Sequence, residues 1–371
     1  MPSVERVTMP KWGLSMKTGK ITAWIAEEGD EVAEGDDLAE IDTDKIAGTL
    51  EAPRAGVLRR IVARAGGEAP VGCVIAVIAG PDVPEDEIER VAAEAREQLA
   101  RGVPAEDEGS PVSGIAEVGG KALAYATSGG GAQEIVLVHG YGGDKNSWLF
   151  VQEPLAVRHT VYALDLPGHG ESGKDVGDGS LDSLATVVTG FLDALGIERA
   201  HLVGHSLGGA VVTAVAARVP DRVRSLTLVA PAGYGPDVDA TYLRGFADAG
   251  TRRELRPHLD RLFADDGLVT RQLVEDLLKY KRLDGVGTAL RTLLTTLVAP
   301  DGGSALDVLS LLPRDVRTVA VWGAADQVIP VSNAASLKGR ADVRVLDAVG
   351  HMAQLEAPGE IVSAVEAAVA G

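Results

Sequence analysis

The feature that most restricts the fold of this chain is a G-x-S-x-G motif, Gly204-His205-Ser206-Leu207-Gly208, which lies between two apolar runs. Residues 201–203 before it have the composition of a buried strand, and residues 211–216 after it have that of a helix. A serine between a strand and a helix occupies a tight turn, which the two glycines leave uncrowded. The motif therefore predicts a turn that presents the Ser206 hydroxyl as a nucleophile at the N-terminus of a helix.

The rest of the chain after about residue 113 alternates between strand-like runs and helical patterns. This alternation predicts a mostly parallel sheet that is covered by helices on both faces. Residues 236–310 interrupt it, because they are charged, helical in pattern and rich in Leu and Arg. The expected strands are 134–139, 160–165, 225–229, 318–323 and 343–346, and helices are expected at 181–195 and 359–370.

A nucleophilic serine needs a base, and the base needs an acid that orients it. Asp326 and His351 each follow a predicted strand, so both are expected at the sheet edge that also carries Ser206. The turn His139-Gly140-Tyr141-Gly142 follows another strand and reaches the same edge. Its Tyr141 N–H and the Leu207 N–H are the candidate donors of an oxyanion hole.

Residues 113–371 resemble the α/β-hydrolase superfamily along their full length. The resemblance rests on the serine turn, the chain order Ser206, Asp326, His351, the 139–142 turn and the run 165–170, Asp-Leu-Pro-Gly-His-Gly. It implies an α/β-hydrolase fold with a helical cap at about 236–310. His139 is expected to pack beneath the oxyanion turn, while His169 and His205 are expected to be parts of turns.

The first 80 residues contain an internal repeat. When the sequence is shifted by 37 positions, residues 19–41 align with residues 56–78, and seven of the 23 pairs are identical, three of them glycines. Short Val-, Ile- and Leu-rich runs of strand length lie between these glycines. The repeat predicts a small all-β sandwich built from two similar halves.

The junction between the two copies, Asp44-Lys45, is flanked by strand-like runs and is expected at the tip of a hairpin. Residues 1–80 resemble a lipoyl domain, and this pair matches the lipoylation motif, although Ile46 stands where the family usually has Ala or Val. Biotin-carrying domains share the fold but place their lysine between methionines. The resemblance therefore implies lipoate attached covalently to Lys45.

Residues 81–112 are predicted to be a charged, helix-bearing linker. The segment 84–87, Pro-Glu-Asp-Glu, is a good helix start, and apolar residues follow at helical spacing up to Leu99. The acidic stretch 106–111 is then expected to be solvated. The chain would thus consist of a lipoyl-type domain at 1–80, a linker at 81–112 and an α/β-hydrolase domain at 113–371.

Composition excludes several classes of function. The net charge of −19 does not suit a nucleic-acid partner, which requires a basic surface. No apolar stretch reaches membrane-spanning length, and the start of the chain does not have the pattern of a secretory signal, so we expect a cytoplasmic protein without a membrane partner. Cys73 is the single cysteine, which leaves no intrachain disulfide and no cysteine-based metal site; we expect no metal.

The combination of the two parts resembles the dihydrolipoamide acetyltransferases of acetoin dehydrogenase complexes. That resemblance implies that a thiamine-diphosphate-dependent component cleaves acetoin and loads acetyl onto the arm at Lys45. This chain would then move the acetyl group to coenzyme A, and a flavin-dependent dihydrolipoamide dehydrogenase would reoxidise the arm. We expect a homo-oligomer within such a complex.

Alternatives remain open at this point. Most lipoyl-bearing acyltransferases carry a His-x-x-x-Asp-Gly motif in another fold, and this sequence has none. Transfer would therefore depend on Ser206, either as a covalent nucleophile or as an oxyanion donor while the thiol attacks directly with His351 as base. A serine hydrolase or thioesterase that carries a lipoyl domain is the main alternative, and a scaffold with an idle second domain is another.

Overall fold

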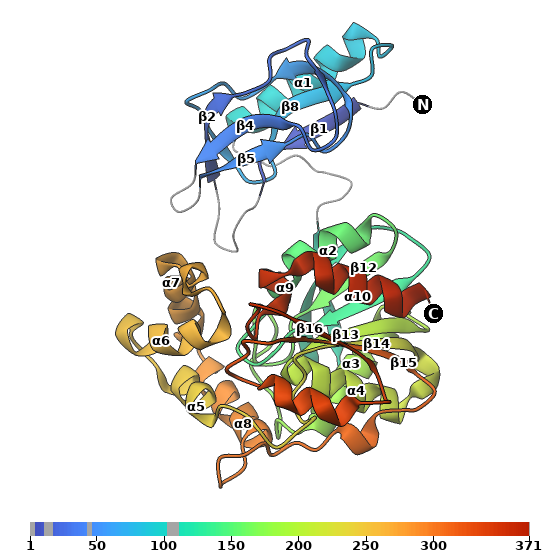
Figure 1. Cartoon of the computed structure of the whole chain (residues 1–371), viewed down its shortest axis with the longest axis vertical. Helices are drawn as coiled ribbons and strands as arrows, with labels where there is room; N and C mark the ends of the chain where they lie inside the picture. The colour runs from blue at the N-terminus through green and yellow to red at the C-terminus, as the bar shows by residue number, and fades with distance from the viewer. Residues whose placement is uncertain (1–3, 11–17, 43–46, 102–110, 371) are drawn as a thin grey trace. The chain divides into compact units, whose positions relative to one another are not determined.

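A computed structural model of the chain shows two compact units, Met1–Ser110 and Pro111–Gly371 (Figure 1). The residues that the structure describes are 4–10, 18–42, 47–101 and 111–370. None of the helices in these ranges is long and apolar enough to cross a membrane. Each unit has its own hydrophobic core, so each is described by itself.

The N-terminal unit is a sandwich of two four-stranded sheets with the orders β1-β8-β6-β3 and β5-β4-β2-β7. Aliphatic side chains from both sheets fill one core, as the predicted all-β sandwich requires. The internal repeat is visible in the backbone, because the equivalent glycines Gly29 and Gly66 have φ of 103° and 83°, and Gly35 and Gly72 have φ of 88° and 80°. The strands are β1 (Val4–Thr8), β2 (Thr18–Trp24), β3 (Glu31–Val32), β4 (Asp37–Asp42), β5 (Ala47–Glu51), β6 (Gly56–Ile61), β7 (Glu68–Pro70) and β8 (Val74–Ala79).

Strands β4 and β5 form the antiparallel hairpin on which the lipoyl assignment depends. Their register places Asp42 opposite Ala47, so the chain reverses direction between these two residues. Lys45 belongs to this connection and lies outside the described residues.

The helix expected in the linker, α1 (Glu85–Arg101), is part of the N-terminal unit instead of a free tether. Ile88, Val91, Ala92 and Ala95 are buried against β8, in one cluster with Val74, Val77 and Ala79. Ion pairs join the start of the helix to β6, with Arg59 2.8 Å from Glu85 and Arg60 3.1 Å from Glu89. The apolar stripe at helical spacing explains this packing, because such a face is stable only when it is covered.

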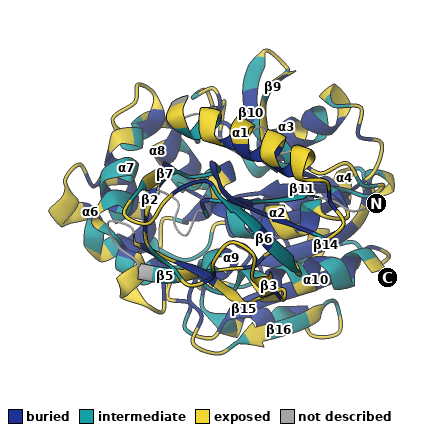
Figure 2. Cartoon of the chain, turned by 90° about the horizontal axis from the view of Figure 1, so that it is seen from above, coloured by how far each residue is buried: buried dark blue, intermediate teal, exposed yellow. Residues whose placement is uncertain are grey.

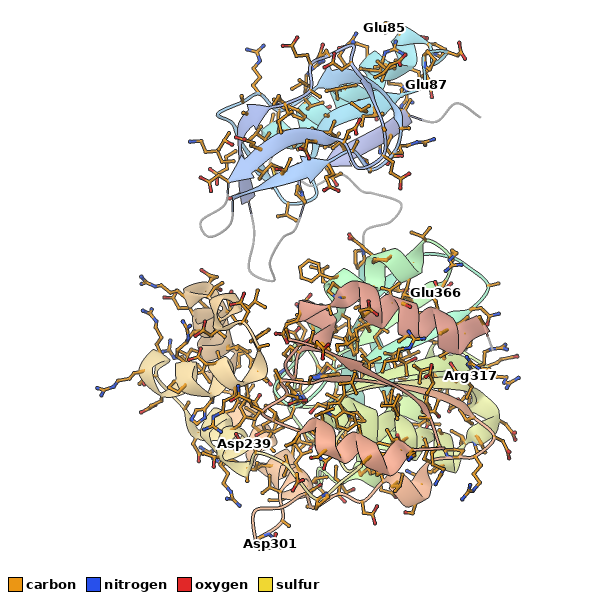
Figure 3. All side chains as sticks on the ribbon, viewed as in Figure 1. Glu85, Glu87, Asp239, Asp301, Arg317 and Glu366 are labelled. Carbon is orange, nitrogen blue, oxygen red and sulfur yellow. The ribbon has the colours of Figure 1, made fainter. Side chains whose placement is uncertain are left out.

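We predict that the backbone amide hydrogens of α1 exchange slowly with solvent when the full-length protein is measured. Ile88→Asp puts a charge into the buried cluster and should raise exchange along the helix to the rate of an unstructured segment. Glu87→Ala changes an exposed side chain one position earlier (Figure 3) and serves as the control. Hydrogen–deuterium exchange with mass spectrometry measures both, and fast exchange of α1 in the unchanged chain would contradict the packed helix.

The C-terminal unit is built on one eight-stranded sheet with the order β16-β15-β14-β13-β11-β12-β10-β9. All neighbours from β16 to β12 are parallel, whereas β10 is antiparallel to both β12 and β9. The expected strands are therefore present, and an antiparallel hairpin extends one edge. The strands are β9 (Val112–Val118), β10 (Lys121–Ser128), β11 (Glu134–Val138), β12 (Thr160–Leu164), β13 (Ala200–His205), β14 (Val223–Val229), β15 (Arg317–Gly323) and β16 (Asp342–Leu346).

Helices cover both faces of this sheet, and the central strands are buried (Figure 2). Val136 and Val138 of β11 face a core that includes α3 (Leu181–Ala194) and α4 (Leu207–Arg218). Ile135 and Leu137 face the opposite core, formed with α2 (Leu149–Ala156) and α10 (Pro358–Ala370). Successive side chains of a strand point to opposite faces, so a strand buried on both sides reads as a continuous apolar run.

A helical cap is inserted between the end of β14 and the start of β15, as the sequence predicts. It contains four α-helices in the described residues, and Figure 1 shows them together beside the sheet. They are α5 (Ala240–Asp248), α6 (Arg252–Leu259), α7 (Arg271–Lys281) and α8 (Val286–Leu297).

Candidate active site

Ser206 occupies the predicted turn between β13 and α4. Its backbone has φ of 53° and ψ of −118°, a conformation that non-glycine residues rarely adopt and that costs free energy. The turn is held by main-chain hydrogen bonds, since the Ser206 N–H donates to Val229 O at 3.0 Å and the Ala232 N–H donates to Ser206 O at 3.0 Å. The surrounding sheet therefore maintains a strained residue at the ends of the parallel strands.

The two glycines of the motif are required by close packing. A side chain on Gly204 would collide with the backbone of Gly208, and a side chain on Gly208 would collide with the carbonyl oxygens of Val138 and His139. The predicted reason for these glycines, crowding at the turn, is thus visible in the structure.

Asp326 and His351 form the buried pair that the sequence predicts. The His351 Nδ1 lies 2.8 Å from Asp326 Oδ2, and both residues are less than a tenth exposed. The other carboxylate oxygen, Oδ1, accepts hydrogen bonds from the N–H groups of Val328 at 2.8 Å and Ile329 at 2.9 Å. These two bonds fix the orientation of the carboxylate independently of the His351 ring. A carboxylate on Nδ1 leaves Nε2 as the basic nitrogen.

His205, which precedes the serine, places His351 beside the turn. Its Nε2 donates to the His351 carbonyl oxygen at 2.9 Å, and the two rings are 4.7 Å apart. Burial lowers the pKa of His205, which keeps the ring neutral and suited to this fixed bond. The structure thus pairs His351 with Asp326 and fixes its backbone to the residue before Ser206, and in the described part of the chain no hydrogen bond joins the Ser206 hydroxyl to His351.

The turn 139–142 lies directly against the serine. A Cβ on Gly140 would be 2.9 Å from the Cβ of Ser206, which leaves only glycine compatible with this approach. Within the described ranges, neither the Tyr141 N–H nor the Leu207 N–H has a hydrogen-bond acceptor. Two free donors beside a serine are the arrangement that an oxyanion hole needs.

Two buried histidines hold this segment in place: His169, which was predicted only to be part of a turn, and His139, which was predicted to pack beneath the oxyanion turn. His169 Nε2 accepts the Gly142 N–H at 3.0 Å, and His139 Nε2 accepts the Leu166 N–H at 3.0 Å. Burial lowers the pKa of both rings. The sequence run 165–170 marked His169 as a candidate for a structural role. It did not reveal the bond to Gly142, because the two residues are distant in the sequence and meet only in the fold.

A buried ion pair anchors the residues that follow the oxyanion turn. The fully buried Asp165 accepts the Lys145 N–H at 2.6 Å and its ammonium at 3.2 Å, and Glu171 accepts the same ammonium at 2.6 Å. Burial opposes the charge of Lys145, but the bonds to Glu171 and Asp165 outweigh it and raise the pKa of Lys145. The ion pair between Lys145 and Asp165 therefore holds the chain that follows the oxyanion turn.

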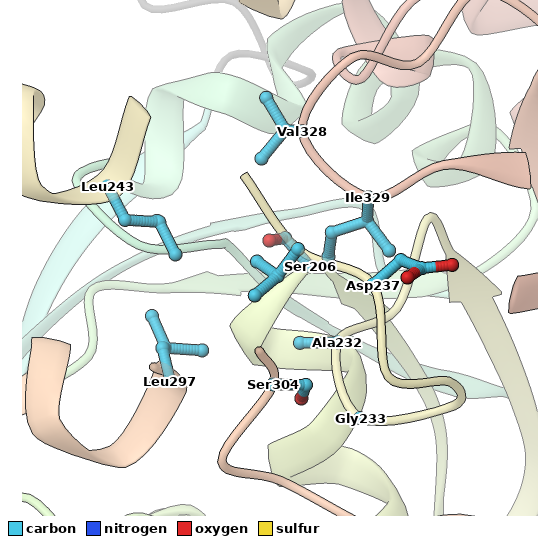
Figure 4. Close-up of a pocket in the computed structure, with 10 residues that line it drawn as sticks. Ser206, Ala232, Gly233, Asp237, Leu243, Leu297, Ser304, Val328 and Ile329 are labelled. Atoms are coloured by element: carbon cyan, nitrogen blue, oxygen red, sulfur yellow. The ribbon is translucent and has the colours of Figure 1, made fainter. Parts of the chain in front are cut away.

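An apolar pocket opens over Ser206, between the sheet and the cap (Figure 4). The space between its lining residues that no atoms occupy is about 320 Å³, a volume that includes open solvent. The cap contributes Leu243 and Leu297, and the loop after Asp326 contributes Val328 and Ile329. The remaining lining residues are Ala232, Gly233, Asp237, Val238 and Ser304. Such a lining suits a small apolar group next to the serine.

Among the described residues, no group of three or more His, Cys, Asp or Glu side chains could hold a metal ion. The chemistry available at the site is that of a serine with an oriented imidazole and two N–H donors, which is acyl chemistry.

Comparison with known families defines the class of protein. The family model described as "alpha/beta hydrolase fold" matches residues 134–358, and the model described as "biotin-requiring enzyme" matches residues 5–78. A meta-cleavage product hydrolase from Pseudomonas fluorescens has a similar structure, with a TM-score of 0.62 and 25% sequence identity over 69% of this chain and 97% of that protein. The protein is thus an α/β-hydrolase-fold protein with a biotinyl/lipoyl-type domain in front.

Relatives that span both domains narrow this class. The dihydrolipoyllysine-residue acetyltransferase component of the acetoin cleaving system from Pseudomonas putida is 46% identical over 363 residues, which are 97% of this chain and 97% of the relative. The component of the same name from Cupriavidus necator is 44% identical over 96% of this chain and 94% of the relative. The chain belongs to the family of dihydrolipoyllysine-residue acetyltransferase components of acetoin cleaving systems.

Proposed function

We propose that this chain moves an acetyl group from a lipoyl arm on Lys45 to coenzyme A, with Ser206, His351 and Asp326 as the catalytic residues. The observation that carries the proposal is the fixed Asp326–His351 pair beside the Ser206 turn, in a chain whose relatives of the same two-domain length are acetyltransferase components. We further propose that a thiamine-diphosphate-dependent acetoin-cleaving component and a flavin-dependent dihydrolipoamide dehydrogenase are its partners, and that it acts in the cytoplasm as a homo-oligomer.

The hairpin of β4 and β5 fits an attached arm. Its register pairs Asp42 at the end of β4 with Ala47 at the start of β5, so the connection that contains Lys45 is short. When bound there, lipoate supplies a thiol that carries an acyl group as a thioester.

In the first half of the proposed reaction, the Ser206 Oγ attacks the carbonyl carbon of the acetyl thioester and His351 Nε2 takes the serine proton. Asp326 stabilises the resulting imidazolium through Nδ1, and the N–H groups of Tyr141 and Leu207 hold the oxyanion. The carbon–sulfur bond then breaks, and His351 returns its proton to the leaving sulfur. The products are an acetyl ester on Ser206 and a free thiol.

In the second half, His351 takes the proton of the coenzyme A thiol and the thiolate attacks the ester. The carbon–oxygen bond breaks, Ser206 recovers its proton from His351, and the acetyl group leaves as a thioester. Water can replace the thiol in this step, and the product would then be acetate. A direct attack of the thiol on the first thioester, with Ser206 only as a donor, is the competing route.

An acyl-transfer assay tests the proposal. Acyl-dihydrolipoamides of several chain lengths are offered to the whole protein with coenzyme A, and both the acyl thioester and the free acid are measured. We expect acetyl-coenzyme A to be the main product. Acid release that is independent of coenzyme A would identify a hydrolase, and no reaction together with inertness to a serine-reactive acylating probe would identify a scaffold.

The lining of the pocket predicts which residue limits the length of the acyl group. Leu297→Ala should raise the ratio of kcat/KM for butyryl over acetyl transfer by about tenfold, because it makes room for further methylenes. Leu255→Ala, a fully buried cap leucine that does not line the pocket, is the matched control. An unchanged ratio in Leu297→Ala, or an equal change in the control, would contradict the assignment.

A further inference from the structure

The side chain of Tyr141 connects the oxyanion turn to the cap. Its ring is buried, with 7% exposure, and its hydroxyl donates to the carbonyl oxygen of Leu290 in α8 at 3.0 Å. Burial raises the pKa of this hydroxyl, so it remains a donor at any physiological pH. The residue whose N–H faces the reaction centre is therefore also bonded to a cap helix.

A second tyrosine makes a parallel connection from α7. The hydroxyl of Tyr280 donates to the carbonyl oxygen of Gly168 at 2.8 Å. The next residue, His169, accepts the N–H of Gly142 at 3.0 Å. The end of α7 is thus linked to the oxyanion turn through two consecutive residues, Gly168 and His169.

Packing closes the space between these two connections. Phe246 of α5 lies so close to Gly142 that a side chain on the glycine would collide with its ring, and its ring is 5.9 Å from that of Tyr141. Lys281, at the end of α7, donates to the Phe246 carbonyl oxygen. Helices α5 and α8 therefore contact the turn that carries the Tyr141 N–H directly, and α7 is linked to it through Gly168 and His169.

We propose that the hydroxyls of Tyr141 and Tyr280 are positioning groups that hold the cap closed over Ser206 and so direct the acetyl group to a thiol instead of water. This inference rests on the proposed function. Both fates of the acetyl ester break the same bond, between the Ser206 Oγ and the carbonyl carbon, and return the same proton to the serine. They differ only in the acceptor that reaches the ester, which is either the thiol or water.

The cap controls that access because Leu243 and Leu297 line the pocket directly. A cap that separates from the turn exposes the ester to water and also releases the residue that holds the oxyanion. Neither tyrosine lines the pocket, so removal of its hydroxyl changes the cap attachment without changing a residue of the pocket lining.

Tyr141→Phe and Tyr280→Phe test the inference, since each removes one hydroxyl and keeps the ring and the backbone N–H. The ratio of acetate to acetyl-coenzyme A should rise about fivefold in each variant, the effect of one lost hydrogen bond. Hydrogen–deuterium exchange along α7 and α8 should also increase in both. Tyr234→Phe, which removes a buried hydroxyl bonded to Thr213 at 2.7 Å, is the control and should change neither quantity.

An unchanged product ratio in both variants would overturn the inference, as would an equal rise in Tyr234→Phe. If one variant fails to fold, the other decides. Failure of the proposed function is a separate result, because the unchanged chain would then form no acetyl-coenzyme A. In that case the exchange measurement still reports whether the tyrosines hold the cap.

Discussion

Ser206→Ala should lower the rate of acetyl transfer to coenzyme A by at least about a thousandfold, as expected when the nucleophile of a triad is removed. We expect a large effect because Ser206 is held at φ of 53° in the proposed catalytic turn, and the neighbouring His205 is bonded to His351 of the fixed Asp326–His351 pair. Alanine occupies the same backbone position as serine, so the loss should reflect the missing hydroxyl and not a changed turn.

The measurement is the single-turnover rate of acetyl-coenzyme A formation from acetyl-dihydrolipoamide. Ser183→Ala is the control, since Ser183 on α3 lines neither the pocket nor the oxyanion turn. Intact mass verifies that the lipoyl modification is unchanged in both variants. If Ser206→Ala transfers acetyl at a near-normal rate, the covalent route is wrong and direct attack by the thiol takes its place.

Lys45→Arg should abolish transfer of acetyl groups supplied by an acetoin-cleaving component, because the variant has no amine on which lipoate can form an amide. The arginine keeps the positive charge, so surface electrostatics are preserved. Transfer from free acetyl-dihydrolipoamide should continue, since the Ser206 site belongs to the other unit of the chain.

Intact mass spectrometry checks this prediction, with Lys20→Arg as the control. Lys20 is an exposed lysine of β2, in the same sheet as the β4–β5 hairpin. The lipoyl mass should be lost in Lys45→Arg and retained in Lys20→Arg. If the Lys45→Arg variant still carried the lipoyl mass, the attachment site would be another residue. If the unchanged chain carried no lipoyl mass, the lipoyl assignment would be wrong.

Local patterns were sufficient to predict the framework of both units. The strand that ends at Val138 is buried on both faces, so its apolar run is continuous and easy to identify. Two of the three glycine pairs of the 37-residue repeat, Gly29/Gly66 and Gly35/Gly72, have positive φ and occupy the predicted turns, whereas Gly19 and Gly56 lie in strands. Ser206, Asp326 and His351 each follow one of the parallel strands of the sheet, so their positions after these strands predicted that they lie at the same edge.

Contacts between distant segments were not predictable in the same way. The Tyr141 hydroxyl bonds to a carbonyl oxygen 149 positions later, and any backbone carbonyl can accept such a bond, so no side-chain type marks the partner. The pairing of His169 with Gly142 has the same origin. The packing of α1 could be predicted in part. Its apolar stripe was visible in the sequence, but the sequence did not show that β8 provides the surface that covers it.

The most direct test of the acyl relay is a rapid-quench experiment with the whole lipoylated chain. The protein is mixed with acetyl-dihydrolipoamide, and one sample is quenched before coenzyme A is added and another sample afterwards. Both samples are digested, and the mass of the peptide that contains Ser206 is measured in each. We predict an acetyl group on Ser206 that coenzyme A removes with formation of an equal amount of acetyl-coenzyme A. Full-rate transfer with no acetyl on Ser206 at any time, or an acetyl-serine that yields only acetate, would contradict this prediction.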